Sequence, residues 1–544
     1  MTRTAKVAIV VLLTLIAYVS VNSIVRATNP RAFVWYEEDK DERSWIASSR
    51  SWFDRKACRW LGICGAAHLQ TVHGPFGRRN PAKWTDPGDS DDNGNDNDNG
   101  DDDNGTDPTK PWQSYWISGG SNHSDWDADE RERREIPDYV FDYAPLVHLY
   151  SKEQFWPGDI AEHLYHTTPH LNYDPIQSES QHPNLSDLDQ LNQYQWGRPV
   201  FLTSNDDPSS RPPWLEGEQN IPEIDDKLVQ EEAWADWDGR VDGQIPGESE
   251  KDRSIWDDLR HLGEKGNDQW FSWGSRANRK LHIELRKRFG GHPIQESLQK
   301  APTDSPPGSP PGTENPGGRS DAPAILVVMD KGNGVVDAFW FFFYSFNLGN
   351  TVVNVRFGNH VGDWEHCLMR FHNGKPKAMF FSAHNGGEAY RYEAIEKIGQ
   401  RPVIYSAEGS HAMYATAGVH EYILPWGLLH DVTDRGPLWD PLQNKQAYTY
   451  ANNTLRASTV NPQSPTEWFF FRGHWGDKFY PLGDRRQYRF AGQYHFVNGP
   501  LGPRFKHLNR RKLCQGPDRA VCVIKDWIGD DVRTPRWTSS GTGE

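Results

Sequence analysis

The residues with the clearest potential for chemistry lie in one segment, RFGNHVGDWEHCLMR, at positions 356–370. A β-strand from Asp363 onward would place Asp363 and Glu365 on one face and Trp364 on the other, because side chains alternate along a strand. Two glycines precede the pair and permit a tight turn that brings His360 over the same face. The spacing therefore predicts two carboxylates and one imidazole close together.

Two carboxylates and one imidazole form a mostly hard ligand set that suits Mg²⁺, Ca²⁺ or Mn²⁺, with water in the open positions. Zinc is less favoured, because the set contains neither a thiolate nor a second histidine. The sequence thus predicts a divalent-cation site, for Ca²⁺ or Mg²⁺, at His360, Asp363 and Glu365. The competing interpretation is that these side chains hydrogen-bond a buried turn and hold no ion.

Two Gly-rich loops, SAHNGGEAY and SAEGSHAMYATAG, follow strand-like runs further along the chain. We expect them to place His384 and His411 at the rim of the same pocket, with Trp364 as a further rim residue. A Ser-His-Asp triad of Ser410, His411 and Asp431 is a weaker alternative in a chain with 21 histidines. Neither loop contains G-x-S-x-G, and the chain has no H-E-x-x-H and no P-loop, so a hydrolase lacks its usual motifs.

The elements that must position these residues are short runs rich in β-branched and aromatic side chains and ended by Gly, Pro or Asn. They include AILVVM, VVDAFWFFFYSF, KAMFFSAH, RPVIYSA and EWFFFRG. Such runs are typical of strands in a buried sheet. The sequence therefore predicts a mainly β fold, a β-sandwich core with helical decorations and long disordered insertions.

Composition supports an ordered core diluted by polar segments. The chain has 544 residues, a mean hydropathy of −0.80 and 12% aromatic residues, whereas disordered chains are poor in aromatics. The net charge is −16, and positions 86–107 alone hold ten Asp and no Lys or Arg. No basic cluster of the kind that nucleic-acid binders need is evident, so nucleic acid is excluded as a partner.

Seven segments are expected along the chain. Two blocks, 136–215 and 324–525, form the β-rich domain, the second being the main sandwich block. The others are a signal anchor or signal peptide at 1–27, a Cys-containing segment at 28–85, an acidic disordered linker at 86–110, a charged and Pro/Gly-rich insertion at 216–323, and a C-terminal tail at 526–544.

The N-terminus predicts entry into the secretory pathway. Arg3 and Lys6 precede an apolar run over 7–25 that is long enough to cross a bilayer. An uncleaved anchor would leave the rest of the chain on the lumenal side as a single-pass membrane protein of the vacuole or endomembranes. Cleavage after Ala27 is the alternative.

Five cysteines fit an oxidising compartment. Cys58 lies close to Cys64 in the sequence, and Cys514 lies close to Cys522, which predicts two loop-closing disulfides and leaves Cys367 as a buried free thiol. Four N-x-[ST] sequons predict glycosylation at exposed asparagines. They lie at Asn104, Asn122, Asn184 and Asn452.

The chain resembles the fungal vacuolar protein sorting-associated protein 62 family. The resemblance rests on YAPLVHLYSKEQFWPGDI, on LTSNDDPSSRPPWLEG and on the long stretch from DKGNGVVDAFWFFFYSF to HDVTDRGPLWDP, and it covers about 136–215 and 324–525. It implies a link to protein delivery to the vacuole.

A more distant resemblance concerns the chemistry. GNHVGDWEH followed by SAH-x-G is similar to the G-H-R-H-D-W-E core and the following S-x-H-G of necrosis- and ethylene-inducing-peptide-like proteins. These are secreted β-sandwich toxins that bind a divalent cation and plant sphingolipid head groups. The resemblance implies that His360, Asp363 and Glu365 fall on three of that family's metal ligands. The chain departs from the pattern at Gly362, where that family has a second His, and near Val352, where it has a further Asp.

Together these features predict a membrane-anchored lumenal glycoprotein linked to protein targeting to the vacuole. We expect a non-enzymatic binding factor with a divalent-cation site, whose partners are the membrane and a glycan, a lipid head group or a cargo protein. One alternative is a metal-dependent hydrolase in which His384 or His411 is the acid or base. The other is a secreted membrane-active protein.

Overall fold

The structure is a computed structural model of the chain. It describes residues 16, 17, 20, 21, 24, 37–69, 110–221, 317–352, 355–384, 386–421, 429–490, 492–516, 521–526 and 528. Most of the predicted N-terminal anchor, the acidic linker with Asn104, most of the charged insertion and most of the C-terminal tail lie outside these residues. Among the helices that are described, none combines the length and the apolar composition needed to cross a bilayer.

The chain divides into two compact units, each built from three segments. Unit 1 comprises Met1–Pro108, Gly349–His360 and Asp477–Gly499, and unit 2 comprises Thr109–Leu348, Val361–Gly476 and Pro500–Glu544. The Cys-containing N-terminal segment is therefore completed by two pieces of the predicted sandwich block, a division that the composition of the sequence does not reveal.

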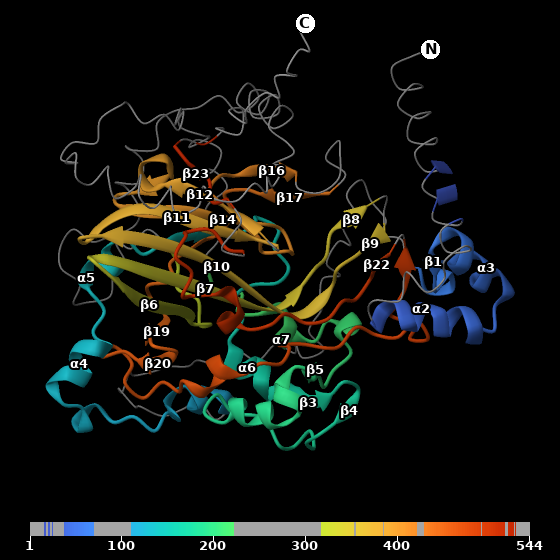
Figure 1. Ribbon diagram of the computed structural model, residues 1–544, viewed down its shortest axis with the longest axis horizontal. Coiled ribbons are helices and arrows are strands. Elements are labelled where there is room, and N and C mark those ends of the chain that lie inside the picture. The colour runs from blue at the N-terminus through green and yellow to red at the C-terminus, as the bar shows by residue number, and fades with distance from the viewer. Residues whose placement is uncertain are drawn as a thin grey trace, which may run out of the picture. The chain divides into compact units, whose positions relative to one another are not determined.

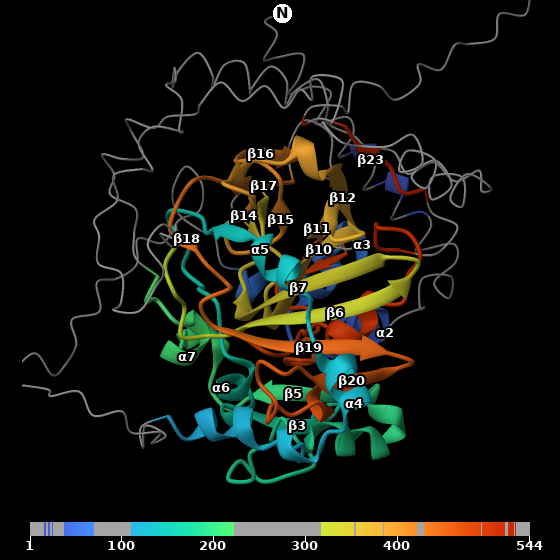
Figure 2. The same cartoon turned by 90° about the vertical axis from the view of Figure 1, so that its left-hand side faces the viewer.

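The centre of unit 2 is an eight-stranded sheet in the order β20-β19-β6-β7-β10-β11-β12-β23 (Figures 1 and 2). Its strands are β6 (Ala324–Gly332), β7 (Val335–Asn347), β10 (His360–His372), β11 (Lys375–Ala383), β12 (Gly386–Arg391), β19 (Lys445–Ala451), β20 (Thr454–Ala457) and β23 (Ile524–Lys525). Most neighbouring strands are antiparallel, but β19 runs parallel to β6, and β23 runs parallel to β12.

Both faces of this sheet are buried, which explains why β7 reads as a nearly unbroken aromatic run. Phe339, Phe341 and Phe343 belong to the hydrophobic core on one face. Trp340 and Phe342, which alternate with them, belong to the core on the other face. A strand with a single buried face would instead show alternating apolar and polar residues.

A second sheet packs on one face and completes the sandwich. Its strands follow the order β13-β14-β2-β18, with β15 paired to β14. The bounds are β2 (Leu146–His148), β13 (Lys397–Ile398), β14 (Arg401–Ser406), β15 (Met413–Tyr414) and β18 (Leu438–Trp439). Val147, Ile404 and Trp439 from this sheet share a core with β7 and β10 of the large sheet, so the mainly β fold predicted from the sequence is confirmed.

The opposite face is covered by helical turns and a small sheet, β4-β3-β5. The elements here are β3 (Thr167–Leu171), β4 (Asp174–Pro175), β5 (Val200–Ser204), α6 (Ile160–Tyr165), η2 (Pro111–Ile117), η4 (Leu188–Gln193), η11 (Glu467–Phe470) and η12 (Pro503–Lys506). Their apolar side chains, among them Leu164, Leu188 and Trp468, fill the space above the sheet. These elements are the predicted helical decorations.

Smaller elements complete unit 2. They are α4 (Ala128–Arg134), α5 (Asp138–Asp142), α7 (Pro213–Glu216), η3 (His123–Asp125), η5 (Gln195–Gly197), η6 (Pro208–Ser210), η9 (Tyr392–Ala394) and the hairpin β16 (Gly418–Glu421) with β17 (His430–Thr433).

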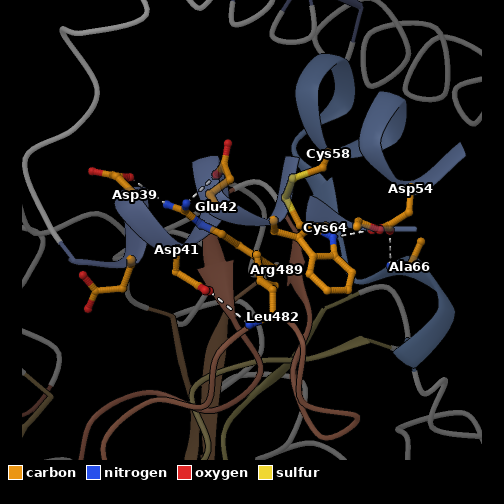
Figure 3. Close-up of a disulfide and its surroundings, with 12 residues drawn as sticks. Asp39, Asp41, Glu42, Asp54, Cys58, Cys64, Ala66, Leu482 and Arg489 are labelled. Atoms are coloured by element: carbon orange, nitrogen blue, oxygen red, sulfur yellow. Dashed lines mark hydrogen bonds and ion pairs between the residues drawn. A yellow bond between two sulfur atoms is a disulfide. The ribbon is translucent and has the colours of Figure 1, made fainter. Parts of the chain in front are cut away.

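From residue 37 onward, the described part of unit 1 contains the helices α2 and α3, the three-stranded sheet β1-β21-β22 and a small hairpin. Its elements are α2 (Glu37–Ser48), α3 (Trp52–Leu61), η1 (Ala66–His68), β1 (Ile63–Cys64), β8 (Thr351–Val352), β9 (Val355–Arg356), β21 (Arg489–Phe490) and β22 (Gln493–Tyr494). Arg489 pairs with Asp39 and Glu42 of α2, as Figure 3 shows. This ion-pair cluster ties the N-terminal helix to a strand that lies more than four hundred residues later.

Both predicted disulfides are present. Cys58 is bonded to Cys64 in unit 1, and Cys514 is bonded to Cys522 in unit 2. Cys367 is a free thiol, fully buried in β10, and burial raises its pKa. The free cysteine is therefore in the protonated, unreactive form at neutral pH.

Three of the four sequons lie in the described residues. Asn122 and Asn452 are exposed, as a glycan requires, whereas Asn184 is half-buried. The Asn184 side-chain oxygen accepts a hydrogen bond from the Ser118 hydroxyl at 3.2 Å. Glycosylation at these positions stays a prediction, with Asn184 the least accessible of the three.

Candidate functional site

The candidate site lies on the face of β10 that is turned toward the second sheet. Asp363 and Glu365 alternate along this strand with Trp364, as the sequence pattern predicts. Cys367, further along the same face, belongs to the core shared with the second sheet. Trp364 and Leu368 belong to the core on the opposite face. Two carboxylates are thus carried by a strand into a largely apolar interface, where a charge needs a partner.

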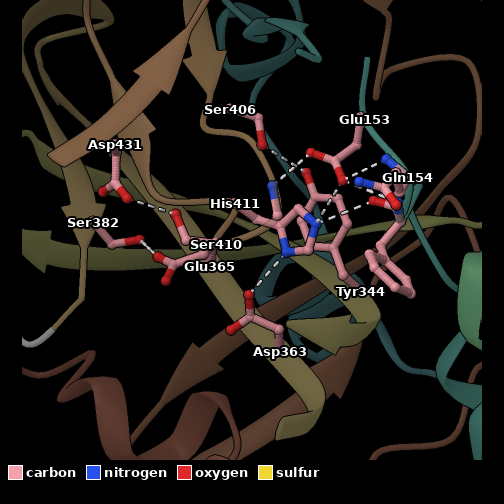
Figure 4. Close-up of polar contacts among 12 residues, drawn as sticks. Glu153, Gln154, Tyr344, Asp363, Glu365, Ser382, Ser406, Ser410, His411 and Asp431 are labelled. Atoms are coloured by element: carbon pink, nitrogen blue, oxygen red, sulfur yellow. Dashed lines mark hydrogen bonds and ion pairs between the residues drawn. The ribbon is translucent and has the colours of Figure 1, made fainter. Parts of the chain in front are cut away.

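His411, in the connection between β14 and β15, is the partner of Asp363. Its Nδ1 lies 3.0 Å from a carboxylate oxygen of Asp363, and its Nε2 lies 3.1 Å from the backbone carbonyl of Phe155 and 3.8 Å from the Glu153 carboxylate. The ring is fully buried and stacks on Tyr344, with the two ring centroids 3.7 Å apart. Figure 4 shows His411 between the two carboxylates.

The hydrogen-bond partners of His411 define its protonation. The backbone carbonyl of Phe155 only accepts hydrogen bonds, so Nε2–H of His411 donates to it. When His411 is protonated, its Nδ1–H also donates to the Asp363 carboxylate. Burial alone would lower the pKa of His411, but Asp363 and Glu153 outweigh it and raise the pKa to about 9. In its imidazolium form His411 has no lone pair with which to bind a metal or accept a proton.

Glu153 is held by backbone amides from two directions. One carboxylate oxygen accepts from the amides of Gln154 and Phe155 at 2.8 and 2.9 Å, and the other accepts from the amide of Gly409 at 2.9 Å. Gly409 has φ +66°, and a Cβ there would lie 2.9 Å from Leu348. The glycine of the SAEGSHAM loop is therefore required for the close approach that joins this loop to Glu153.

Among the described residues, Glu365 is hydrogen-bonded by the Ser382 hydroxyl and not by a cationic side chain, although the Lys506 ammonium is near enough to lower the pKa of Glu365. The Ser382 hydroxyl donates to the Glu365 carboxylate and accepts from the backbone amide of His366 at 2.9 Å. Burial and, more weakly, the neighbouring Asp363 raise the pKa of Glu365 to about 8. Glu365 is thus a buried carboxyl group whose charge would be favoured by an added cation.

Asp431, on β17, organises a second group of polar side chains. It is almost fully buried and accepts hydrogen bonds from Tyr414 at 2.7 Å and from Ser410 at 3.0 Å. His384 Nε2 lies 2.7 Å from the same carboxylate. Burial opposes the charged form of His384, but Asp431 outweighs it and raises the pKa of the ring. His384 is 33% exposed, so this imidazole connects the buried carboxylates to solvent.

The two predicted rim histidines share an unusual backbone. His384 has φ +53° and His411 has φ +54°, values in the left-handed region that are uncommon outside glycine. Their hydrogen bonds to Asp431 and Asp363 hold them there. The triad alternative is wrong, because both ring nitrogens of His411 are engaged elsewhere and Ser410 bonds directly to Asp431.

The remaining predicted site residues lie apart from this cluster or cannot be related to it. Trp364 was expected at a pocket rim, but it is buried on the opposite face of β10 against Phe343 and Trp475. The correction follows from the period of two, because neighbours of Asp363 and Glu365 must point away from them. His360 begins β10 but belongs to unit 1, so its part in a three-residue cation site stays a prediction.

Gly362 explains one departure from the toxin-like motif. It has φ +69°, and a Cβ at this position would lie 1.7 Å from the carbonyl oxygen of Trp475. No side chain fits there, so the second histidine of the motif is excluded by packing.

Several partners in the site carry no signal in the sequence. Glu153 lies far from Asp363 along the chain and arrives because β2 pairs in parallel with β14. Ser382 and Tyr414 are ordinary residues of strand ends. Ser382 reaches Glu365 through the pairing of the consecutive strands β10 and β11, whereas Glu153 comes from a segment more than two hundred residues earlier in the chain.

The donor set fits a hydrated cation better than a fully protein-ligated one. In the described ranges, the only group of three potential ligands in close contact is Glu42 with Cys58 and Cys64, whose sulfurs are joined in a disulfide. Asp363 and Glu365 supply two carboxylates, a number typical for Mg²⁺, which keeps several of its waters. Ca²⁺ would need more oxygen atoms from water or from a bound ligand.

Sequence similarity to known proteins shows which family this chain belongs to. A sequence model described as vacuolar protein sorting-associated protein 62 matches residues 328–480. The putative vacuolar protein sorting-associated protein TDA6 of Saccharomyces cerevisiae is 35% identical over 443 residues, which are 75% of this chain and 73% of that protein. Vacuolar protein sorting-associated protein 62 of the same yeast is 33% identical over 418 residues, or 71% and 69% of the two chains. The chain belongs to the vacuolar protein sorting-associated protein 62 family.

The family match contains every residue of the candidate site except those of the segment 153–155. Among solved structures, one titled "Toxin fold for microbial attack and plant defense" is 13% identical and covers 27% of this chain and 55% of that one, with a TM-score of 0.15. "NLPPya in complex with mannosamine" is 14% identical, with 27% and 54% coverage and a TM-score of 0.15. At these values neither structure bears on the function of the vacuolar protein sorting-associated protein 62 family member described here.

Proposed function

We propose that this protein is a membrane-attached, glycosylated lumenal factor of vacuolar protein sorting that binds its ligand without chemical conversion. Family membership carries the proposal, because relatives at 35% and 33% identity are named as vacuolar protein sorting-associated proteins. The apolar run at 7–25 supports membrane attachment, and the two disulfides support an oxidising compartment.

In this proposal, Asp363 and Glu365 hold a Ca²⁺ or Mg²⁺ ion that helps to bind a glycan, a lipid head group or a cargo protein. The raised pKa of Glu365 supports a cation there, since buried neighbouring carboxylates are stabilised by added positive charge. His384, the most exposed member of the cluster, marks the side from which a ligand would approach. His360 is a further candidate ligand.

Vacuolar delivery in fungal cells that lack the gene tests the proposal. The wild-type chain should restore retention of a vacuolar hydrolase, and Glu365→Gln should let the hydrolase be secreted at an equal level of the sorting protein. Glu467→Gln, a carboxylate removed from η11 on the other face of the sheet, is the matched control and should restore delivery. Normal delivery with Glu365→Gln would refute a role for the site in sorting.

One observation favours a hydrolase as the second candidate. His384 and Asp431 form the imidazole–carboxylate pair of a general base, with the ring partly exposed beside the two β10 carboxylates. In such an enzyme the metal would polarise the substrate, and His384, oriented by Asp431, would accept a proton from water. His384→Gln would then abolish turnover of a glycoside or ester substrate while cation binding persists, whereas the binding factor has no turnover to lose.

A further inference from the structure

Helix α3 of unit 1 turns its aromatic residues outward. Trp52 and Phe53 are 65% and 67% exposed, and Trp60 and Leu61 are 44% and 41% exposed. The small or polar residues of the same helix are the buried ones, among them Asp54. An arrangement with large apolar groups outside and a carboxylate inside is the reverse of ordinary core packing, which marks an interaction surface.

Helical geometry places basic side chains on the same exposed face. At 100° per residue, Arg59, Trp52, Lys56, Trp60 and Phe53 follow one another around an arc of about 120°. Lys56 and Arg59 are exposed, and no ion pair engages either of them within the part of the chain that the structure describes. We call these five residues the α3 face.

The fold fixes this orientation, so the α3 face cannot turn inward. Ser51 caps the first turn by accepting from the amide of Asp54, and Gly62 ends the helix in a left-handed conformation. The buried Asp54 carboxylate accepts from the amide of Ala66 at 2.8 Å. The disulfide from Cys58 anchors the same side of the helix to β1 (Figure 3).

We infer that the α3 face docks onto anionic phospholipid in the lumenal leaflet of the membrane to which the chain is attached. Tryptophan and phenylalanine favour the boundary between head groups and acyl chains, and lysine and arginine between them contact lipid phosphates. Each basic residue at an anionic membrane surface strengthens binding about fivefold. Both parts of the α3 face therefore suit the same partner.

The proposed N-terminal anchor would keep this helix close to the membrane. Eleven residues separate the end of the apolar run at 25 from Glu37, where α2 begins. They span at most about 40 Å, so unit 1 would remain within that reach of the bilayer and α3 would bind as a tethered second contact. The inference rests on the membrane attachment proposed above and adds a second, independent contact.

A release experiment tests both contacts separately. A protease site is inserted after Asn29, and the full chain is reconstituted in phosphatidylcholine vesicles with or without phosphatidylserine, then floated before and after cleavage. We expect the cut chain to stay on vesicles with phosphatidylserine. Lys56→Glu with Arg59→Glu, or Trp52→Ser with Phe53→Ser, should lower that binding at least about tenfold. Arg131→Glu with Lys152→Glu, two exposed positions in unit 2, is the charge-matched control and should change nothing.

The outcomes separate the two claims. Release of the cut wild-type chain from phosphatidylserine vesicles, with the uncut chain still bound, overturns the α3 inference alone and points to another chain segment or a protein as the occupant. If the uncut wild-type chain floats but the uncut α3-face variants do not, attachment by residues 1–27 is refuted and the α3 inference is supported. A wild-type chain that never floats overturns both. Hydroxyl-radical oxidation should also show Trp52, Phe53 and Trp60 protected on the vesicles, with Trp196, 75% exposed in unit 2, unprotected as the internal reference.

Discussion

Asp363→Asn separates the charge of the buried Asp363–His411 pair from its shape. The asparagine keeps the size of the side chain and its ability to accept a hydrogen bond from His411 Nδ1, but it removes the negative charge that faces the imidazolium. The part of the stability loss that varies with the protonation of His411 therefore measures the contribution of the Asp363 charge.

The size of that loss follows from linkage. The folded-state pKa of His411 is about 9 against 6.5 for the free side chain. A raised pKa stabilises the fold fully below pH 6.5, and this contribution is lost as the pH rises through 9. At pH 7 it amounts to about 2.5 kcal/mol and at pH 9.5 to less than about 0.3 kcal/mol. Because Glu153 remains, we expect Asp363→Asn to cost about 1 to 2.5 kcal/mol at pH 7.

Urea unfolding of both proteins at pH 6.5, 8 and 9.5, in chelator, measures this loss. The difference between them should shrink steadily with increasing pH. Asp440→Asn is the matched control: Asp440 is equally buried but pairs with Arg401, whose guanidinium keeps its charge over this range. Its cost should stay constant. If Asp363→Asn costs the same at pH 6.5 and pH 9.5, the His411 ring is neutral and our account of the site is wrong.

Four further predictions concern single side chains. In thermal melts, Ca²⁺ or Mg²⁺ at a hundredfold excess over its dissociation constant should stabilise the wild type by about 2.7 kcal/mol and Glu365→Gln by much less. Equal stabilisation of the two proteins would mean that these carboxylates only hydrogen-bond a buried turn and hold no ion. Since the folded pKa of Glu365 is raised from 4.5 to about 8, its contribution is fully present below pH 4.5 and is lost as the pH rises to 8, so in chelator Glu365→Gln should gain stability relative to wild type over this range and reach its full gain above pH 8. Cys367 should react with a maleimide only after unfolding, and non-reducing peptide mapping that finds it in a bridge would contradict the disulfide assignment. Asn122 and Asn452 should carry glycans removable by an amidase, and full occupancy of Asn184 with neither of these modified would contradict the exposure argument.

Local patterns in the sequence predicted the local structure well. The strand predicted over 335–346 is observed as Val335–Asn347, because its β-branched and aromatic residues suit a sheet buried on both faces. The alternation around Asp363 and Glu365 also holds, since a period of two is a property of any strand. Cys58 and Cys64 are close enough in the chain for their pairing to follow from proximity.

The partners of the site residues were beyond prediction from one sequence. Whether His411 meets Asp363, Asp431 or Ser410 depends on which strands pair and in which register. A shift of one residue would turn every side chain of a strand to the other face. Glu153 reaches His411 only through the parallel pairing of β2 with β14. The division into two units, which interrupts the predicted sandwich block twice, likewise depends on contacts distant in the chain.

The position of β2 between β14 and β18 delays the folding of this strand during synthesis of the chain. His148 lies opposite Leu438, so about 290 residues must be made before the strand gains its second neighbour. At about 5 to 20 residues per second, roughly 15 to 60 s pass while the first apolar block waits with unpaired backbone groups. Asn184, half-buried in the finished protein, therefore stays open during that interval to any enzyme that acts on the nascent chain.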